Sequence, residues 1–131
     1  MNIKIFAEAS NGRRLHCTCV PSLIAGRFVI REEDEEILST VKKGRAIQVF
    51  DPQKSLVGLV ELNWIGRGAR IAQSDHSTKV REAFAPLWPR FQSDHLSLQL
   101  GHESAEMTCE PSIFETAVTF AFYQIQTLTN H

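Results

Sequence analysis

The segment SIFETAVTFAFYQIQTL, residues 112–128, is the clearest helical stretch in this chain of 131 residues. Ser112 and Glu115 stand three positions apart, the spacing of a capping box at a helix start. Apolar side chains then recur every three or four positions, which predicts a helix with one strongly apolar side. That side consists of Phe114, Ala117, Val118, Ala121, Phe122, Ile125 and Leu128.

The opposite side of this helix carries no charge, because its residues are Thr116, Thr119, Phe120, Tyr123, Gln126 and Thr127. A helix face in water normally contains lysine and glutamate, so we expect another element or another chain to cover this one. We therefore take Phe120, Tyr123 and Thr116 as candidate interaction residues. Trp88 joins them, because aromatic and arginine side chains such as those of FAPLWPRF, residues 84–91, dominate the energetics of interfaces.

Alternation of apolar and polar residues predicts β-strands over much of the remaining chain. The strongest local signal is Asn11-Gly12, a turn sequence typical of a β-hairpin. A turn at 51–55 and another at 101–104 predict two more antiparallel pairs. The predicted strands lie at residues 3–6, 15–20, 27–30, 46–50, 56–65, 95–100 and 105–109.

Two further segments have features of helices. Residues 32–44, EEDEEILSTVKKG, place acids first, lysines last and a glycine after them, an order that suits the helix macrodipole and a C-terminal stop. We predict a short surface helix there. In residues 74–88, Val80, Phe84, Leu87 and Trp88 recur at helical spacing after a polar stretch that can cap a helix, which predicts a longer helix that kinks or ends before Pro89.

Together these patterns predict one α+β domain over residues 1–131. We expect a mainly antiparallel sheet of about six or seven strands, packed by two longer helices and one short helix. A chain of this length can bury a core without disulfides or a structural metal.

Composition excludes several classes of function. The chain is 43% hydrophobic and 22% charged, with a formal net charge of -1, so no long-range field favours a nucleic acid or an anionic membrane. The N-terminus has no signal-peptide pattern, and no apolar run reaches the roughly 20 residues that span a bilayer. We expect a cytoplasmic protein with no membrane partner, whose three cysteines are free thiols.

The segment His16-Cys17-Thr18-Cys19 gathers metal-ligating residue types, but alternation on a strand divides them between two faces. Cys17 and Cys19 then share a face with Leu15 and are expected in the core, where cysteine behaves as a small apolar residue. A structural zinc site needs four ligands, and this spacing supplies two at most. We predict no metal and no cofactor.

Catalytic motifs are equally weak. Ser74-Asp75-His76 and Ser93-Asp94-His95 contain the residue types of a hydrolase triad, but adjacent residues cannot form that triad with one another. Neither serine lies in a nucleophile-elbow sequence. Helix capping and turn formation explain both tripeptides, so we assign no catalytic residue.

A basic cluster offers an alternative. Lys42, Lys43 and Arg45 are close in sequence, and Arg67 and Arg70 occupy a glycine-containing loop that could bring them near the first three. Phosphate contacts require such positive charge. No aromatic residues alternate with these arginines as stacking platforms, which makes a nucleic-acid partner the minor hypothesis.

The sequence thus favours a small, soluble, non-enzymatic binding or regulatory protein that acts through protein–protein contacts and self-associates, as a homodimer in the simplest case. One alternative is a nucleic-acid-binding accessory protein that uses the basic cluster. Another is a small-molecule-binding protein or an enzyme with an aromatic-lined pocket near Trp64 or Trp88.

Overall fold

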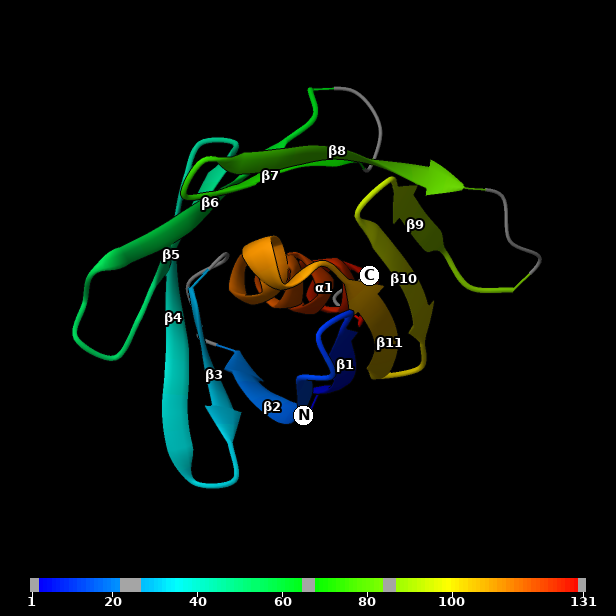
Figure 1. The fold of residues 1–131 in the computed structure, drawn as a ribbon. Coiled ribbons are helices and arrows are strands. Elements are labelled where there is room, and N and C mark those ends of the chain that lie inside the picture. Colours follow the sequence, from blue (N-terminus) through cyan, green and yellow to red (C-terminus); the bar gives the residue numbers. More distant parts are fainter. Residues whose placement is uncertain (1–2, 22–26, 65–67, 84–86, 130–131) are drawn as a thin grey trace.

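The structure is a computed structural model that describes residues 3–21, 27–64, 68–83 and 87–129. Within these residues eleven strands close into a barrel around one α-helix, α1 (Phe114–Thr129), which follows a short 3-10 turn at Pro111–Ile113 (Figure 1). The strands are β1 (Ile3–Ala9), β2 (Arg14–Pro21), β3 (Phe28–Glu32), β4 (Glu35–Lys43), β5 (Ala46–Phe50), β6 (Leu56–Leu62), β7 (Ala69–Gln73), β8 (His76–Ala83), β9 (Arg90–Ser93), β10 (Leu96–Gly101) and β11 (Ser104–Cys109).

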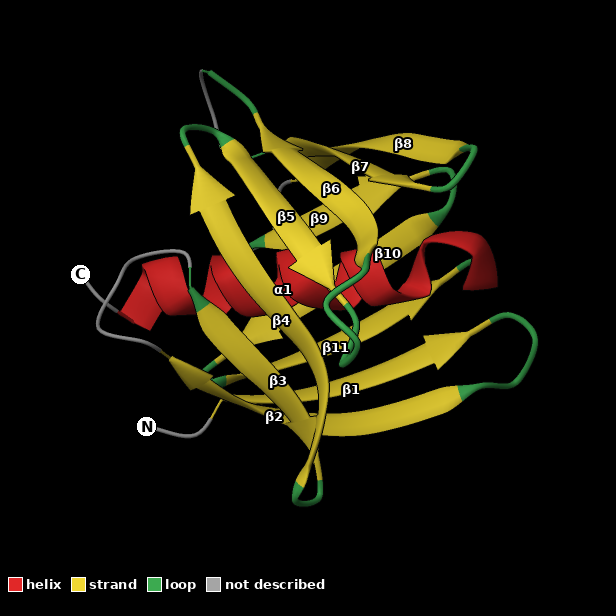
Figure 2. Ribbon diagram, turned by 90° about the vertical axis from the view of Figure 1, so that its left-hand side faces the viewer, coloured by secondary structure: helices red, strands yellow, loops and turns green. Residues whose placement is uncertain are grey.

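The barrel is a meander that closes on itself. Strands adjacent in sequence pair antiparallel from β1 through β11, and β1 then pairs parallel with β11, from Lys4 opposite Ser104 to Ala9 opposite Cys109. Closure gives every strand two neighbours and leaves no free sheet edge. Figure 2 shows α1 running lengthwise through the ring of strands.

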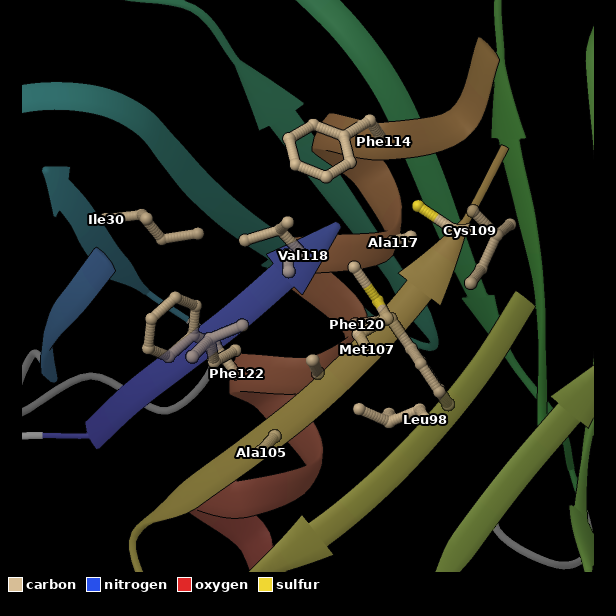
Figure 3. Close-up of a cluster of buried hydrophobic side chains, with 14 of the residues drawn as sticks. Ile30, Leu98, Ala105, Met107, Cys109, Phe114, Ala117, Val118, Phe120 and Phe122 are labelled. Carbon is tan, nitrogen blue, oxygen red and sulfur yellow. The ribbon is translucent and has the colours of Figure 1, made fainter. Parts of the chain in front are cut away.

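The core lies between α1 and the inner face of the barrel. Phe114, Phe120 and Phe122 are all 0% exposed, and Figure 3 shows them among inward side chains of the strands. The Phe120 ring packs edge-on against Phe91 of β9, with ring centroids 5.2 Å apart. A helix without a charged face can only be stable if it is covered on all sides, and the barrel provides that cover.

The predicted α+β architecture is wrong. The structure has a closed barrel in place of an open sheet of six or seven strands, and one α-helix in place of two longer helices and a short one. The C-terminal helix itself is confirmed. Its uncharged side is covered by the strands of the same chain, which is one of the two possibilities that the sequence left open.

The helix predicted at 32–44 is a β-hairpin instead. Glu33 has a φ of 56° and forms the turn between β3 and β4, and Gly44, with a φ of 61°, forms the next turn instead of ending a helix. Leu38 and Thr40 of β4 are buried, while the intervening Ser39 is partly exposed. Ile, Thr and Val in this segment are β-branched and favour a strand, and this preference outweighs the charge order that suggested a helix.

The helix predicted at 74–88 is also wrong. Ser74, with a φ of 53°, forms the turn between β7 and β8, and residues 76–83 continue as a strand. Thr78 and Val80 point inward at period two. Residues 84–86 lie outside the described residues. The apolar spacing that resembled a helix thus combines one inward residue of β8, Val80, with residues that follow the strand in sequence.

The predicted strand pairs at both ends of the chain and at 46–62 are confirmed, including the buried leucines of β10. The capping role of Glu115 is replaced by contacts across the barrel mouth, where its carboxylate accepts hydrogen bonds from Arg13 Nη1 and Gln73 Nε2, both at 2.7 Å. Burial raises the pKa of Glu115, but these two hydrogen bonds, a backbone hydrogen bond and the positive charge of Arg13 together hold the pKa below its usual value of 4.5.

Candidate interaction surface

Because α1 fills the barrel, the outer faces of the strands provide most of the surface available to a partner. On each strand the residues between buried positions point outward, and the register aligns them in rows that cross the strands. One row passes through Lys43, Ala46, Glu61, Arg70 and Lys79 and is dominated by charge.

Two other rows carry no charge at all, and together they form what we call the uncharged face, on β3 to β8. The first row is Val29, Ser39, Phe50 and Leu56, and the second is Val41, Gln48, Leu59, Ala72 and Ser77. The apolar members are partly exposed, and Leu56 is 59% exposed. The core of a protein interface is depleted in charge in the same way.

The uncharged face is also hollowed. A depression of about 510 Å³ lies over β3, β4 and β5, and its lining includes the apolar residues Val29, Val41 and Phe50 and the cations Arg27 and Lys54. Such a depression can accept an apolar side chain from a partner. The surface therefore offers both partly exposed apolar side chains and a recess between them.

The two ends of the uncharged face carry opposite charge. The turn between β3 and β4 holds Glu33 and Asp34, and β4 begins with Glu35 and Glu36. Lys42 and Lys43 end the same strand at the opposite rim of the barrel. Strand β4 therefore runs from an acidic end, across uncharged residues, to a basic end.

The structure separates the four residues that the sequence nominated for interaction. Phe120 and Thr116 are 0% exposed inside the barrel, so the strands of their own chain occupy the contacts expected of a partner. Tyr123 is partly buried and packs against the core. Trp88 is 39% exposed next to β9, with its ring centroid 6.2 Å from that of His102, and lies outside the uncharged face.

The basic residues nominated for nucleic acid are brought together only in part. Lys42, Lys43 and Arg45 flank one hairpin turn, and the Arg45 guanidinium lies 4.7 Å from the centre of the Trp64 ring. Arg70 shares the charged row with Lys43, but its Nη1 lies 3.5 Å from Oε1 of Glu61, which offsets its charge. Arg67 lies outside the described residues.

The cysteines lie where alternation predicted them. Cys17 and Cys19 are each 1% exposed and face the core with Leu15, and Cys109 of β11 is also buried. Burial is the main cause that raises the pKa of each thiol to about 12, so the thiols stay protonated at neutral pH. Among the described residues no group of three or more His, Cys, Asp or Glu could hold a metal ion.

The opposite side of the barrel carries a more polar groove of about 810 Å³ over β1, β2 and β9 to β11. Phe6, 49% exposed, stacks on His16 there with centroids 4.3 Å apart. In a neighbouring depression, His95 Nδ1 lies 2.8 Å from Oε1 of Glu110. Ser93 of the same tripeptide uses its hydroxyl to accept a hydrogen bond from the His95 backbone N–H at 3.1 Å, which is a turn contact.

Comparison with known proteins adds no assignment, since no protein-family model, no curated protein and no solved structure matches this chain. Among the described residues no helix is long and apolar enough to cross a membrane. The surface must therefore be judged on its own geometry and chemistry.

The uncharged face could not be predicted from the sequence, because it depends on the register of the paired strands. Val41 lies in the segment that was predicted as a helix, whereas on β4 it points outward. In regular alternation Leu56 would share a strand face with the buried Val60, but a register irregularity between Val49 and Phe50 leaves Leu56 outside the barrel. The available signal was the scarcity of charge at alternate positions 39–41, 48–50 and 57–59.

Proposed function

We propose that this chain is a small, non-enzymatic binding protein that acts through protein–protein contacts and associates with itself through the uncharged face. The observation that carries the proposal is the pair of charge-free rows on the barrel exterior, with Leu56 at 59% exposure. Partly exposed apolar side chains without charged neighbours in their rows resemble the core of an interaction site, which is depleted in charge.

The way the barrel is filled supports binding at the exterior. Some β-barrels of similar strand number hold a ligand in their interior. Here the side chains of α1 occupy that position, and Phe120, Phe122 and Ile125 are all 0% exposed. A partner that recognises this fold must therefore do so mainly from outside.

A substitution at the centre of the uncharged face tests the proposal. Leu59→Glu places an uncompensated charge within the uncharged face. Thr108→Glu is the control, because it adds the same charge at an exposed position of β11, on the other side of the barrel. We expect the wild type and Thr108→Glu to associate in sedimentation equilibrium at about 100 μM and Leu59→Glu to remain a folded monomer. A monomeric wild type, or a Leu59→Glu variant that associates normally, would overturn the proposal.

A further inference from the structure

We propose that two copies of this chain pack face to face with their β4 strands antiparallel, so that the acidic end of one uncharged face meets the basic end of the other. This inference rests on the proposed function and adds the orientation and the charge dependence of the contact. The charges at the two ends of β4 and the symmetry of a dimer support this arrangement.

The acidic end carries a net negative charge after its own cations are counted. Five carboxylates, on residues 32–36, lie near two cations, Arg31 and Lys54, which leaves a net charge of -3. Lys54 Nζ lies 3.9 Å from Oε1 of Glu36, and Arg31 donates through Nη1 to the Asp34 carbonyl at 3.4 Å. The acidic end therefore presents exposed carboxylates to a partner, on Glu33, Asp34 and Glu35.

The basic end carries the opposite excess. Five cations, Lys42, Lys43, Arg45, Arg70 and Lys79, lie near one carboxylate, Glu61, which leaves a net charge of +4. Of these cations all but Lys42 are exposed. The uncharged rows separate the two ends, so neither end neutralises the other within one chain.

Symmetry leaves two simple ways to pair two identical faces. A two-fold axis that lies in the interface along β4 would place acid on acid and base on base. A two-fold axis in the interface but perpendicular to β4 places each acidic end on the basic end of the other copy, and it brings the uncharged rows together between them. Opposite charges at the rim favour the second arrangement and oppose the first.

The size of the face sets the concentration at which the dimer should be sought. Six strands at about 4.8 Å spacing span about 24 Å, and the nine residues of β4 extend about 30 Å. Because these six strands curve around a closed barrel, a second barrel can contact only part of that area, less than the roughly 800 Å² that each partner buries in a standard interface. A contact of this size is typical of weak association, in which charge at the rim has a measurable effect.

Two charge-reversal variants test the arrangement. The acid-reversed variant carries Asp34→Lys and Glu35→Lys, and the base-reversed variant carries Lys43→Glu and Lys79→Glu; all four positions are exposed. We expect each variant alone to self-associate at least tenfold more weakly than the wild type at about 50 mM salt. An equimolar mixture should recover a heterodimer, seen by its distinct mass in native mass spectrometry. Glu8→Lys with Glu106→Lys, on the polar side of the barrel, is the matched control and should associate as the wild type does.

The outcomes separate this inference from the proposed function. If the wild type associates and Leu59→Glu abolishes association, but the charge reversals have no effect, the antiparallel arrangement is wrong and the interaction surface stands. The arrangement is also wrong if both reversed variants are weakened and their mixture does not recover. A wild type that stays monomeric refutes both proposals, and urea midpoints close to that of the wild type establish that the variants are folded.

Discussion

The enclosure of α1 by the barrel predicts a large cost for Phe120→Ala. Phe120 is 0% exposed and packs edge-on against Phe91 at 5.2 Å between centroids. Truncation of a buried phenylalanine costs about 3–5 kcal/mol, because it removes apolar contacts and leaves a cavity that the surrounding barrel cannot fully close. This is a large share of the roughly 5–15 kcal/mol by which a domain of this kind is stable.

Phe6→Ala is the matched control for that experiment. Phe6 is 49% exposed on the barrel exterior and stacks only on His16. Its truncation should cost less than about 1 kcal/mol, as surface substitutions usually do. The same residue type is thus removed from inside and from outside one barrel wall.

Urea unfolding followed by circular dichroism, at a concentration low enough to keep the protein monomeric, measures both variants. With a slope of about 2 kcal/mol/M, Phe120→Ala should lower the urea midpoint by about 2 M, and Phe6→Ala by less than about 0.5 M. If Phe120→Ala costs no more than Phe6→Ala, then α1 is not enclosed and the description of the core is wrong.

Three further predictions follow from particular contacts. A Cβ at Gly58 would lie 2.6 Å from the Ala72 carbonyl oxygen and would also meet the Thr116 hydroxyl, so Gly58→Ala should lower the free energy of unfolding by about 1–3 kcal/mol. In the control Gly101→Ala, the Cβ would approach the Ser104 hydroxyl at 3.1 Å, and the cost should be less than about 1 kcal/mol. Equal urea midpoints for the two variants would contradict the close packing of α1 on β6. Because the pKa of Glu115 is lowered in the folded state, its contribution to the free energy of unfolding is present above pH 4.5 and is lost as the pH falls through its folded pKa. The loss of stability caused by Glu115→Gln should therefore be larger at pH 7 than at pH 3. A loss that does not depend on pH would refute this prediction. A thiol reagent at pH 8 should react slowly with the native protein and rapidly after unfolding, while fast native modification would show that the strand faces are reversed at Cys17, Cys19 and Cys109.

Local patterns in the sequence predicted much of the secondary structure. Asn11-Gly12 marked the first hairpin, and alternating leucines marked β10 with its partner β11. The C-terminal helix and its uncharged side were also clear, since period and composition both describe one segment. These features depend on neighbours in sequence, which is why they could be found without the fold.

The two wrongly predicted helices have a common physical origin. The charge order at 32–44 and the apolar spacing at 74–88 are compatible with a helix and also with a strand. Acids before lysines favour a helix dipole, but the same order is equally stable at the two ends of β4 once β3 and β5 pair with it. The parallel pairing of β1 with β11 joins residues about a hundred positions apart, and no local pattern encodes it. An uncharged helix therefore suggested an external partner, although the strands of its own chain enclose it.

The uncharged face could not be found before the strands were in register. Its residues come from six strands, and each contributes only one or two of them. Leu59 and Val41 become neighbours of one surface only because Gln48 lies between them in a cross-strand row. Charge patterning along β4 was visible from the start, but its meaning changed when the segment proved to be a strand.

Hydroxyl-radical footprinting of the wild type at about 1 μM and about 200 μM tests the central claim most directly, because it reports the exposure of individual side chains on either side of the expected association range. We expect that modification of Leu56, Leu59 and Phe50 falls at the higher concentration, that Phe6 is modified equally at both, and that Phe120 is protected at both. Concentration-dependent protection of Phe6 without protection of Leu59, or modification of Phe120 in the folded protein, would contradict this expectation.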